Sequence, residues 1–314
     1  MGLPISAAPY DVPSLDGYNQ LPLLSLEYQR ALRRATILKL VTNTNPKPVR
    51  VHMGSTIRIP IMPQVRSRRV EVNYENEYSS PQPDYIDVDI DRIRAFDFKT
   101  IDVQDLQSQI LGTGKTWGDA AGVNMGEDIE EEIFGELAAL IPAANQGVDA
   151  GIKYGGTNLG SITAPRTVSS AEGATFILDA ILDLNVAVSE NDVEETDRFI
   201  IAPDKIMARL KSSLRKANEM GDAKSMLYGR TVGSIDHTTF LSCNRLPVCA
   251  KVNGLPVYPV LCLHKSAVAY HVQGENIERI RLERTPSWGY RSECVYGYKA
   301  VQPKAMAIGY YAVS

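Results

Sequence analysis

The chain has 314 residues, of which 44% are hydrophobic and 22% charged, and its formal net charge is −4 at pH 7. This composition is that of a soluble globular protein with one large or two smaller domains. The small net charge excludes a general attraction to nucleic acid or membranes, and no apolar run of about 18 residues predicts a membrane span. Residues 1–25 lack the basic start and apolar stretch of a secretory signal.

The four cysteines, Cys243, Cys249, Cys262 and Cys294, include no CxxC pair and no zinc-binding spacing with histidine. We therefore expect free, mostly buried thiols in a reducing compartment. The four histidines are scattered, and we expect them to be ordinary packed or surface residues. The sequence thus predicts no metal site and no cofactor.

The N-terminal region is predicted to be an extended arm followed by a helix. Residues 1–24 contain four prolines, so an arm there needs something to hold it. Ser25 is a plausible N-cap for a helix that ends near Val41. We take residues 1–47 as this first part of the chain.

Residues 48–100 predict a long hairpin, with strands over 51–72 and 85–98 and a polar turn over 73–84. Apolar and polar residues alternate in both strands, which indicates one buried and one exposed face. Pro60 and Pro63 predict an edge or bulged strand, since proline cannot donate to a ladder. A hairpin of this length is marginal alone, so it lies either on its own domain or on a neighbouring copy.

A long one-sided helix is predicted from Asp119 to Ile141. Its apolar stripe contains Ile129, Ile133, Phe134, Leu137, Leu140 and Ile141. Acidic residues crowd the preceding turns, where they favour the helix dipole and are expected to form either a solvated face or a binding surface. The one-sided stripe predicts that the helix packs lengthwise on a sheet.

The remaining sequence mixes helices and strands without a regular βαβ repeat, which favours an α+β fold. A helix is predicted after the capping-box spacing of Ser169 and Glu172, and another after Pro203. A short helix is expected over 264–271. Strands are predicted over 161–164, 198–202, 232–241, 257–263, 277–283, 290–299 and 305–311.

Candidate chemistry is sparse. The segment from Gly112 to Thr116 resembles the end of a phosphate-binding loop, but Gln109 occupies the position of the first glycine, so a flexible link is the preferred interpretation. Asp87, Asp89 and Asp91 share one strand face and could hold a divalent cation, although an exposed face explains them more simply. With no nucleophile elbow or HExxH motif, the sequence predicts no catalytic residue and no enzyme.

Basic residues are concentrated near the start of the chain. The first 70 positions contain ten basic residues and only three acidic ones. They favour either contact with phosphates or pairing with acidic residues of a neighbouring copy. We prefer pairing between copies. The candidate contacts are Arg66, Arg68 and Arg69 on the hairpin, and Glu127, Asp128, Glu130 and Glu131 on the long helix.

The order of these parts resembles the major capsid protein of tailed bacteriophages, which has the Hong Kong 97-like fold. The resemblance covers most of residues 25–314 and depends mainly on the order of weak local motifs. The segments that carry it are 54–60, 96–102, 198–203, 229–235, 254–258 and 296–305. They are similar to the family's extended loop and its return, the central strand with its helix, two apical strands and the closing strands.

The resemblance implies an N-terminal arm and helix (1–47), an extended hairpin loop (48–100), a spine helix with peripheral domain (101–165), an apical domain (166–275) and closing peripheral strands (276–314). It also implies pentamers and hexamers in an icosahedral phage head around double-stranded DNA, assembled in the bacterial cytoplasm. Portal, scaffold or cement proteins are implied partners. No crosslinking lysine and asparagine are matched, so no covalent crosslink is expected.

Two alternatives to a phage head stay open at the level of sequence. A protein compartment of the encapsulin type shares this fold but encloses protein. The third hypothesis, from another functional class, is a nucleotide-binding enzyme that uses residues 112–116.

Overall fold

The structure is a computed structural model that describes residues 36–45, 53–61, 63, 65, 67, 69, 78, 80–101, 113–168, 177–217, 231–235, 238–247, 249–274, 278–283 and 287–313. The chain divides into two compact units. Unit 1 comprises Met1–Ala35, Ala95–Met125 and Glu275–Glu293, and unit 2 comprises Thr36–Arg94, Gly126–Gly274 and Cys294–Ser314. The mixture of helices with parallel and antiparallel strands confirms the predicted α+β class.

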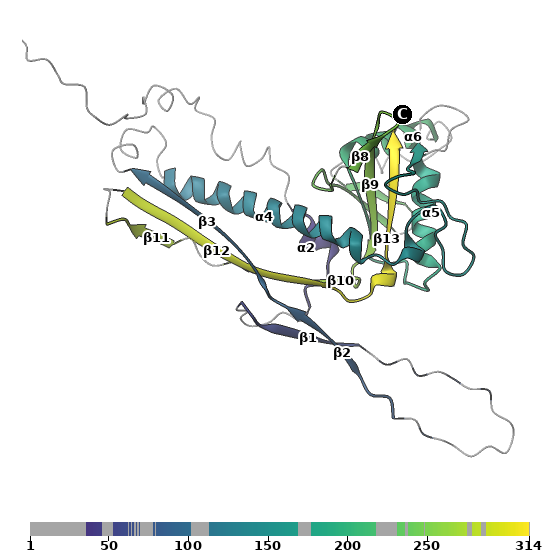
Figure 1. Ribbon diagram of the computed structural model, residues 1–314, viewed down its shortest axis with the longest axis horizontal. Helices are drawn as coiled ribbons and strands as arrows, with labels where there is room; N and C mark the ends of the chain where they lie inside the picture. Colours follow the sequence, from purple (N-terminus) through teal and green to yellow (C-terminus); the bar gives the residue numbers. More distant parts are fainter. Residues whose placement is uncertain are drawn as a thin grey trace, which may run out of the picture. The chain divides into compact units, whose positions relative to one another are not determined.

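Unit 2 contains a seven-stranded mixed sheet in the order β4-β13-β9-β5-β7-β6, in which β8 also pairs with β9. Strands β8, β9 and β13 of this sheet are labelled in Figure 1, next to helices α5 and α6. The β4–β13 and β5–β7 pairs are parallel, and the others are antiparallel. Its strands are β4 (Arg166–Val168), β5 (Arg198–Ala202), β6 (Thr231–Ile235), β7 (Thr238–Ser242), β8 (Cys249–Val252), β9 (Leu255–His264) and β13 (Met306–Val313). Every residue of β5 and β13 is buried, as expected for strands covered on both faces.

Helices α5 (Ile177–Ser189) and α6 (Asp204–Ala217) contribute to one core with this sheet. The apolar stripe predicted for α5 is confirmed from Ile177 to Val188, while Phe176 lies outside the described residues. The Tyr311 hydroxyl donates to the Ala180 carbonyl oxygen at 2.9 Å and so ties α5 to β13. The core consists mainly of aliphatic side chains that alternate along the strands.

Helix α4 (Thr113–Leu140) is longer than predicted and starts six residues earlier. Its first half contains glycine and alanine rather than an apolar stripe, so helical periodicity is weak there. The predicted link over Thr113–Thr116 is therefore helical. Ile129, Ile133, Phe134 and Leu137 are buried as expected, but Leu140 is 43% exposed because it is the last helical residue.

A second, four-stranded sheet is built on the long strand β12 (Ser287–Ala300). In unit 2, β10 (Val268–Gly274) pairs with residues 294–300 of β12, and in unit 1, β11 (Glu278–Arg281) pairs with residues 288–291. Strand β3 (Arg92–Ile101) also pairs with β12. Strands β3 and β12 and helix α4 each have residues in both units.

Unit 1 is organised around aromatic rings rather than aliphatic side chains. Phe98 stacks on Tyr290 with ring centroids 5.1 Å apart and meets the edge of Trp117 at 6.1 Å. The Arg279 guanidinium lies 3.9 Å above the Trp288 ring. Among the described residues of this unit, none of the hydrophobic side chains is fully buried.

The predicted hairpin is present but shorter in its described part. Strand β1 (Thr56–Ile61) pairs antiparallel with β2 (Asp84–Asp89), so that Arg58 faces Asp87. The return strand, predicted as continuous, breaks at Ile90 and Asp91 before β3 begins. The alternation is confirmed, since Ile57 and Ile59 are half-buried between exposed neighbours.

The base of the hairpin is held by backbone contacts. The Gly54 N–H donates to the Ile90 carbonyl oxygen at 2.8 Å, and the Ile90 N–H donates to the Ser55 carbonyl oxygen at 2.9 Å. Gly54 has a φ of 84°, and a residue with a side chain would be strained in this backbone conformation. Gly297 of β12 approaches the backbone at Asp89 so closely that a Cβ atom there would lie 2.2 Å from the Asp89 carbonyl oxygen.

Three sequence predictions of local structure were wrong. Residues 264–271 form the end of β9, a turn and the start of β10 rather than a helix, because a short apolar run is equally compatible with a strand. Residues 161–164 bend, and the short strand follows at Arg166. Residues 232–241 contain two strands, β6 and β7, paired as a hairpin.

At the N-terminus, the described part starts at Thr36, and helix α2 (Leu38–Val41) covers the end of the predicted helix. The predicted arm and the first residues of that helix lie outside the described residues. All four cysteines are free, and Cys243, Cys262 and Cys294 are buried, which confirms the expected thiols.

We predict that Gly297→Ala lowers the free energy of unfolding by about 2 kcal/mol, because the new methyl group collides with backbone rather than with a movable side chain. Chemical denaturation followed by circular dichroism measures the change. Gly135→Ala is the matched control, since its Cβ meets nothing within 4 Å on an exposed helical turn. It should raise stability by about 0.5–1 kcal/mol, and equal effects of the two changes would contradict the close approach at Gly297.

Candidate functional site on the long helix

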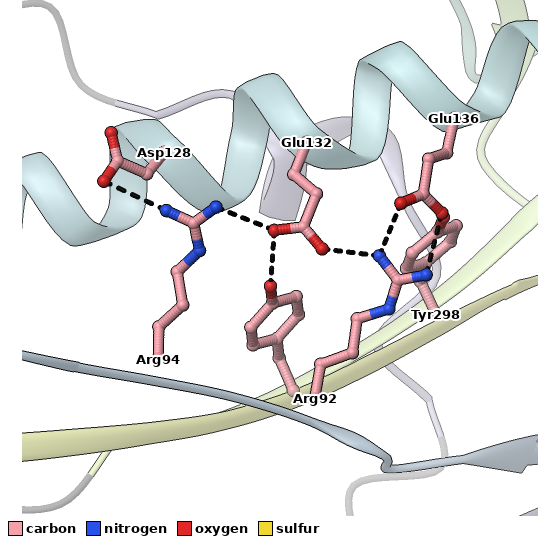
Figure 2. A network of polar contacts seen from close by, with 7 residues as sticks. Arg92, Arg94, Asp128, Glu132, Glu136 and Tyr298 are labelled. Atoms are coloured by element: carbon pink, nitrogen blue, oxygen red, sulfur yellow. Dashed lines mark hydrogen bonds and ion pairs between the residues drawn. The ribbon is translucent and has the colours of Figure 1, made fainter.

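The most connected polar site in unit 2 is a ladder of three carboxylates on α4. Asp128, Glu132 and Glu136 follow one another at four-residue spacing, so they lie along one side of the helix. Arg92 and Arg94 face them from β3, where alternate residues share a face. We call these five residues the carboxylate ladder (Figure 2).

Each of the two arginines in the carboxylate ladder binds two successive carboxylates of the helix. Arg92 binds Glu136 with both terminal nitrogens, at 2.8 and 2.7 Å, and also donates to Glu132 at 2.6 Å. Arg94 donates to Glu132 at 2.8 Å and pairs with Asp128 at 3.0 Å. Two-pronged guanidinium–carboxylate contacts fix orientation as well as distance.

Two tyrosines of β12 complete the site. The Tyr296 hydroxyl donates to Glu132 at 2.8 Å, and the Tyr298 hydroxyl donates to Glu136. The Arg92 guanidinium also lies over the Tyr298 ring, 4.9 Å from its centroid. Glu132 therefore accepts hydrogen bonds from three side chains on two strands, which makes it the centre of the network.

Hydrogen bonds lower the pKa of two carboxylates of the ladder, Glu132 and Glu136. Hydrogen bonds from Arg92 and then Tyr298 lower the pKa of Glu136 from 4.5 to about 2. Burial alone would raise the pKa of Glu132, but hydrogen bonds from Arg94, Tyr296 and Arg92 outweigh it and lower that pKa. Carboxylates held this way are poor proton donors and acceptors near neutral pH, so the site suits holding elements together rather than acid–base chemistry.

A second site lies on the next face of α4. Glu130 is fully buried and accepts hydrogen bonds from the backbone N–H groups of Ile37 at 2.5 Å and Leu38 at 2.9 Å. Arg245 pairs with Glu130 at 2.6 Å and with Glu127 at 2.7 Å. Burial raises the pKa of Glu130, against the opposing effects of these donors. One carboxylate thus joins α4, the segment before α2 and the loop after β7.

The structure places the predicted contact residues as follows. Glu127 and Glu130 pair with Arg245, and Asp128 pairs with Arg94, all within the chain. Glu131 is exposed and makes no ion pair with any described residue. Arg69 is exposed as well, whereas Arg66 and Arg68 lie outside the described residues.

Sequence reasoning missed the arginines that satisfy these acids. Two periodic signals were available: the two-residue spacing of Arg92 and Arg94, and the four-residue spacing of the three carboxylates. Neither signal says which basic residue meets which acid across about 40 positions of sequence. Arg245 carried no periodic signal at all.

The other candidate sites have simpler roles. Thr113–Thr116 form the first turn of α4, and Gly112 lies outside the described residues. Asp87 pairs with Arg58, and Asp89 accepts from the Thr56 hydroxyl at 3.0 Å. Within the described ranges, no group of three acidic, histidine or cysteine side chains is arranged to hold a metal ion. Among the same residues, no helix is both long and apolar enough to cross a membrane.

No protein-family model and no curated protein matches the sequence. Solved structures do match its fold. A structure from Mycobacterium phage Che8 aligns with a TM-score of 0.60 and 18% identity, covering 88% of this chain and 91% of that one. The capsid of Ralstonia phage GP4 aligns at 0.57 and 10% identity, covering 89% and 90%.

The capsid of cyanophage P-SCSP1u aligns at a TM-score of 0.55 and 12% identity, covering 90% of this chain and 89% of that one. These similarities extend over nearly the whole of each chain despite very low identity. The chain therefore has the Hong Kong 97-like fold of tailed-phage capsid proteins, as the sequence resemblance predicted.

We predict that Glu132→Ala lowers the free energy of unfolding by about 2 kcal/mol, because it leaves the donors of Arg92, Arg94 and Tyr296 without their shared acceptor. Glu131→Ala is the matched control one position away, exposed and unpaired among the described residues, and should change stability by less than about 0.5 kcal/mol. Urea denaturation of both variants measures the difference. Similar losses in the two variants would show that the carboxylate ladder contributes little.

The low pKa of Glu136 predicts how stability depends on pH. The folded state holds Glu136 ionised down to pH about 2, while the unfolded chain protonates it near its ordinary 4.5. Its stabilising effect is therefore complete above pH 4.5 and is lost as pH falls toward 2. The effect should be at most about 1 kcal/mol, because the side chain is 47% exposed and screened by water. Denaturation from pH 6 to 2 should show a shallower decline for Glu136→Gln than for the native chain.

Proposed function

We propose that this chain is the major capsid protein of a tailed bacteriophage, which assembles as pentamers and hexamers into an icosahedral head around double-stranded DNA. The observation that carries the proposal is a fold similarity that spans about nine-tenths of both chains compared, two of them named as phage capsids. The protein acts by building a shell and has no catalytic role. Its location is then the virion, after assembly in the bacterial cytoplasm.

The hairpin supports a role in contacts between copies. Strands β1 and β2 form a two-stranded sheet, which has little stability alone. Ile57, Ile59 and Ile61 line one face of β1 and are only half-buried within the chain. A neighbouring copy that covers this face would add the missing apolar burial.

The charged contacts between copies follow from the same arrangement. We propose that Arg66, Arg68 and Arg69 meet carboxylates on the long helix of a neighbour. Glu131 is the best placed of these, because Glu127, Asp128 and Glu130 already have partners in their own chain. Glu127 and Asp128 are then secondary contacts that would share an arginine with a neighbour, whereas the predicted contact at Glu130 is ruled out because its side chain is fully buried in its own chain.

The proposed parts are the arm and helix (1–47), the extended hairpin loop (48–100), the spine helix with peripheral domain (101–165), the apical domain (166–275) and the closing strands (276–314). The seven-stranded sheet draws most of its strands from the proposed apical range, which supports that assignment. Portal, scaffold or cement proteins are proposed partners, because a closed head needs an entry vertex and a route to one size. DNA contact needs no sequence specificity.

Electron microscopy of the purified protein, expressed alone and with its neighbouring genes, tests this function. We expect closed icosahedral particles, and a variant that lacks residues 66–80 should stay folded by circular dichroism but form none. Particles that enclose protein rather than DNA would indicate a compartment of the encapsulin type. Only small soluble species from the native chain would contradict a shell role, whereas shells from the shortened chain would contradict the role of the hairpin alone.

A further inference from the structure

The paired strands β10 and β12 have two faces with different neighbours. Tyr296 and Tyr298 point toward α4, where they bind the carboxylate ladder. Alternate residues of a strand point to opposite faces, so Gly297 and Lys299 lie on the other side. His271 is opposite Gly297 in the antiparallel register, and residues that face each other in this way share one side of the sheet.

The end of β2 covers this second face of the strand pair. A Cβ atom on Gly297 would lie only 2.9 Å from the Cδ1 atom of Ile90. The ammonium group of Lys299 donates to the Asp87 carbonyl oxygen at 2.8 Å. We call residues 87–90 the hairpin base, and they cross β12 on its second face.

The hairpin base turns its apolar side chains toward the strand pair. Val88 and Ile90 are fully buried. The alternate residues, Asp87 and Asp89, have their carboxylates on the opposite face, where they bind residues of β1. His271 therefore lies beside the apolar side chains of the hairpin base and not beside its carboxylates.

His271 is a titratable residue in a core position. It is 4% exposed, and its Nε2 atom is buried without a hydrogen-bond partner among the described residues. A neutral imidazole bears this at a modest cost, because one of its nitrogens is only an unused acceptor or donor. An imidazolium bears it at a much higher cost, since both nitrogens then carry a proton and the ring carries a charge.

The groups around His271 do not offset such a charge. Ala269 and Gln273, its neighbours on the same face of β10, do not ionise, and Lys299 of β12 is itself positive. Asp91, which follows the hairpin base, is exposed to water. Burial alone lowers the pKa of the His271 imidazole below its ordinary 6.5.

We propose that His271 is an acid-sensitive contact that holds the hairpin base on β10 and β12 when neutral and releases it when protonated. Protonation places a charge beside Val88 and Ile90, and the imidazolium reaches water only if the hairpin base lifts. The inference goes beyond the proposed shell function, because it concerns how one chain holds its own hairpin. Acidity then controls the attachment of the segment that is also the proposed contact with a neighbouring copy.

The direction of the effect with pH follows from the two states. In the released state His271 binds its proton near the ordinary pKa of 6.5, and in the attached state it does so only at lower pH. Attachment is therefore strongest above pH 6.5 and weakens as the pH falls. The equilibrium constant for release should rise by up to about tenfold for each pH unit, until the attached state also binds the proton.

A reporter thiol on the buried side of the hairpin base tests the proposal in the full chain. Val88→Cys places a small apolar residue at a fully buried position, so its alkylation rate measures release. Peptide mapping separates this thiol from the four native cysteines, and dividing by the rate of a free peptide thiol removes the intrinsic effect of pH. We expect the corrected rate to rise at least tenfold between pH 7.5 and 5.

Replacing His271 in the reporter chain should abolish this response to pH. His271→Phe keeps a ring that cannot titrate, and His271→Gln is a smaller uncharged replacement for use if the first variant does not fold. The other histidines are the controls, and His52→Gln, His237→Gln and His264→Gln should each leave the response unchanged. His52 is the most important of these, because it precedes the hairpin in the sequence.

Nuclear magnetic resonance titration of the His271 ring gives a second, reciprocal test. If protonation lifts the hairpin base, then loosening the base must raise the pKa of His271, so Ile90→Ala should move it toward 6.5. An undiminished acid response in both His271 variants would overturn the proposal. A reporter thiol that stays protected at pH 5, or a His271 pKa that Ile90→Ala leaves unchanged, would overturn it as well.

Discussion

The contact on which unit 2 most depends is the match between a helix and a strand in the carboxylate ladder. Four residues of α-helix advance about 6 Å, and two residues of strand advance about 6.7 Å. Carboxylates at every fourth position of the helix are therefore spaced almost equally to arginines at every second position of the strand, so each arginine lies opposite a carboxylate along this site. A slip of one strand residue would turn Arg92 and Arg94 to the other face, so the contact fixes register as well as proximity.

This kind of contact shows that a chain with a net charge of only −4 can hold several ion pairs between its own elements, from the half-exposed carboxylate ladder to the buried Glu130. Bringing charges out of water costs free energy, and a buried pair often contributes less to stability than apolar residues of equal size. Here the ion pairs allow only one alignment of helices and strands that are far apart in the sequence. Glu130 acts in the same way, because its buried carboxylate accepts donors from two separate segments, the start of α2 and the loop after β7.

The sequence alone predicted those elements whose own pattern of apolar and polar residues shows which face is buried. The stripe on α5, the buried strand β5 and the alternation in β1 all follow from local periodicity. The order of elements along the chain then led to the correct fold. The sequence did not show which residues contact each other across the chain. A carboxylate such as Glu132 lies in the same local sequence pattern whether it contacts water, Arg94 or a neighbouring copy. The burial of His271 was equally invisible, since it depends on where the hairpin base crosses the sheet.

The position of β13 has a consequence for the order in which the protein can fold during its synthesis. This strand lies between β4 and β9, all eight of its residues are buried, and it is the last strand described along the chain. The sheet cannot be completed, and α5 cannot dock on Tyr311, before residues 306–313 have been made. A chain synthesised only as far as β9 therefore lacks the strand between β4 and β9, and the apolar side chains that β13 covers are exposed until that strand is made.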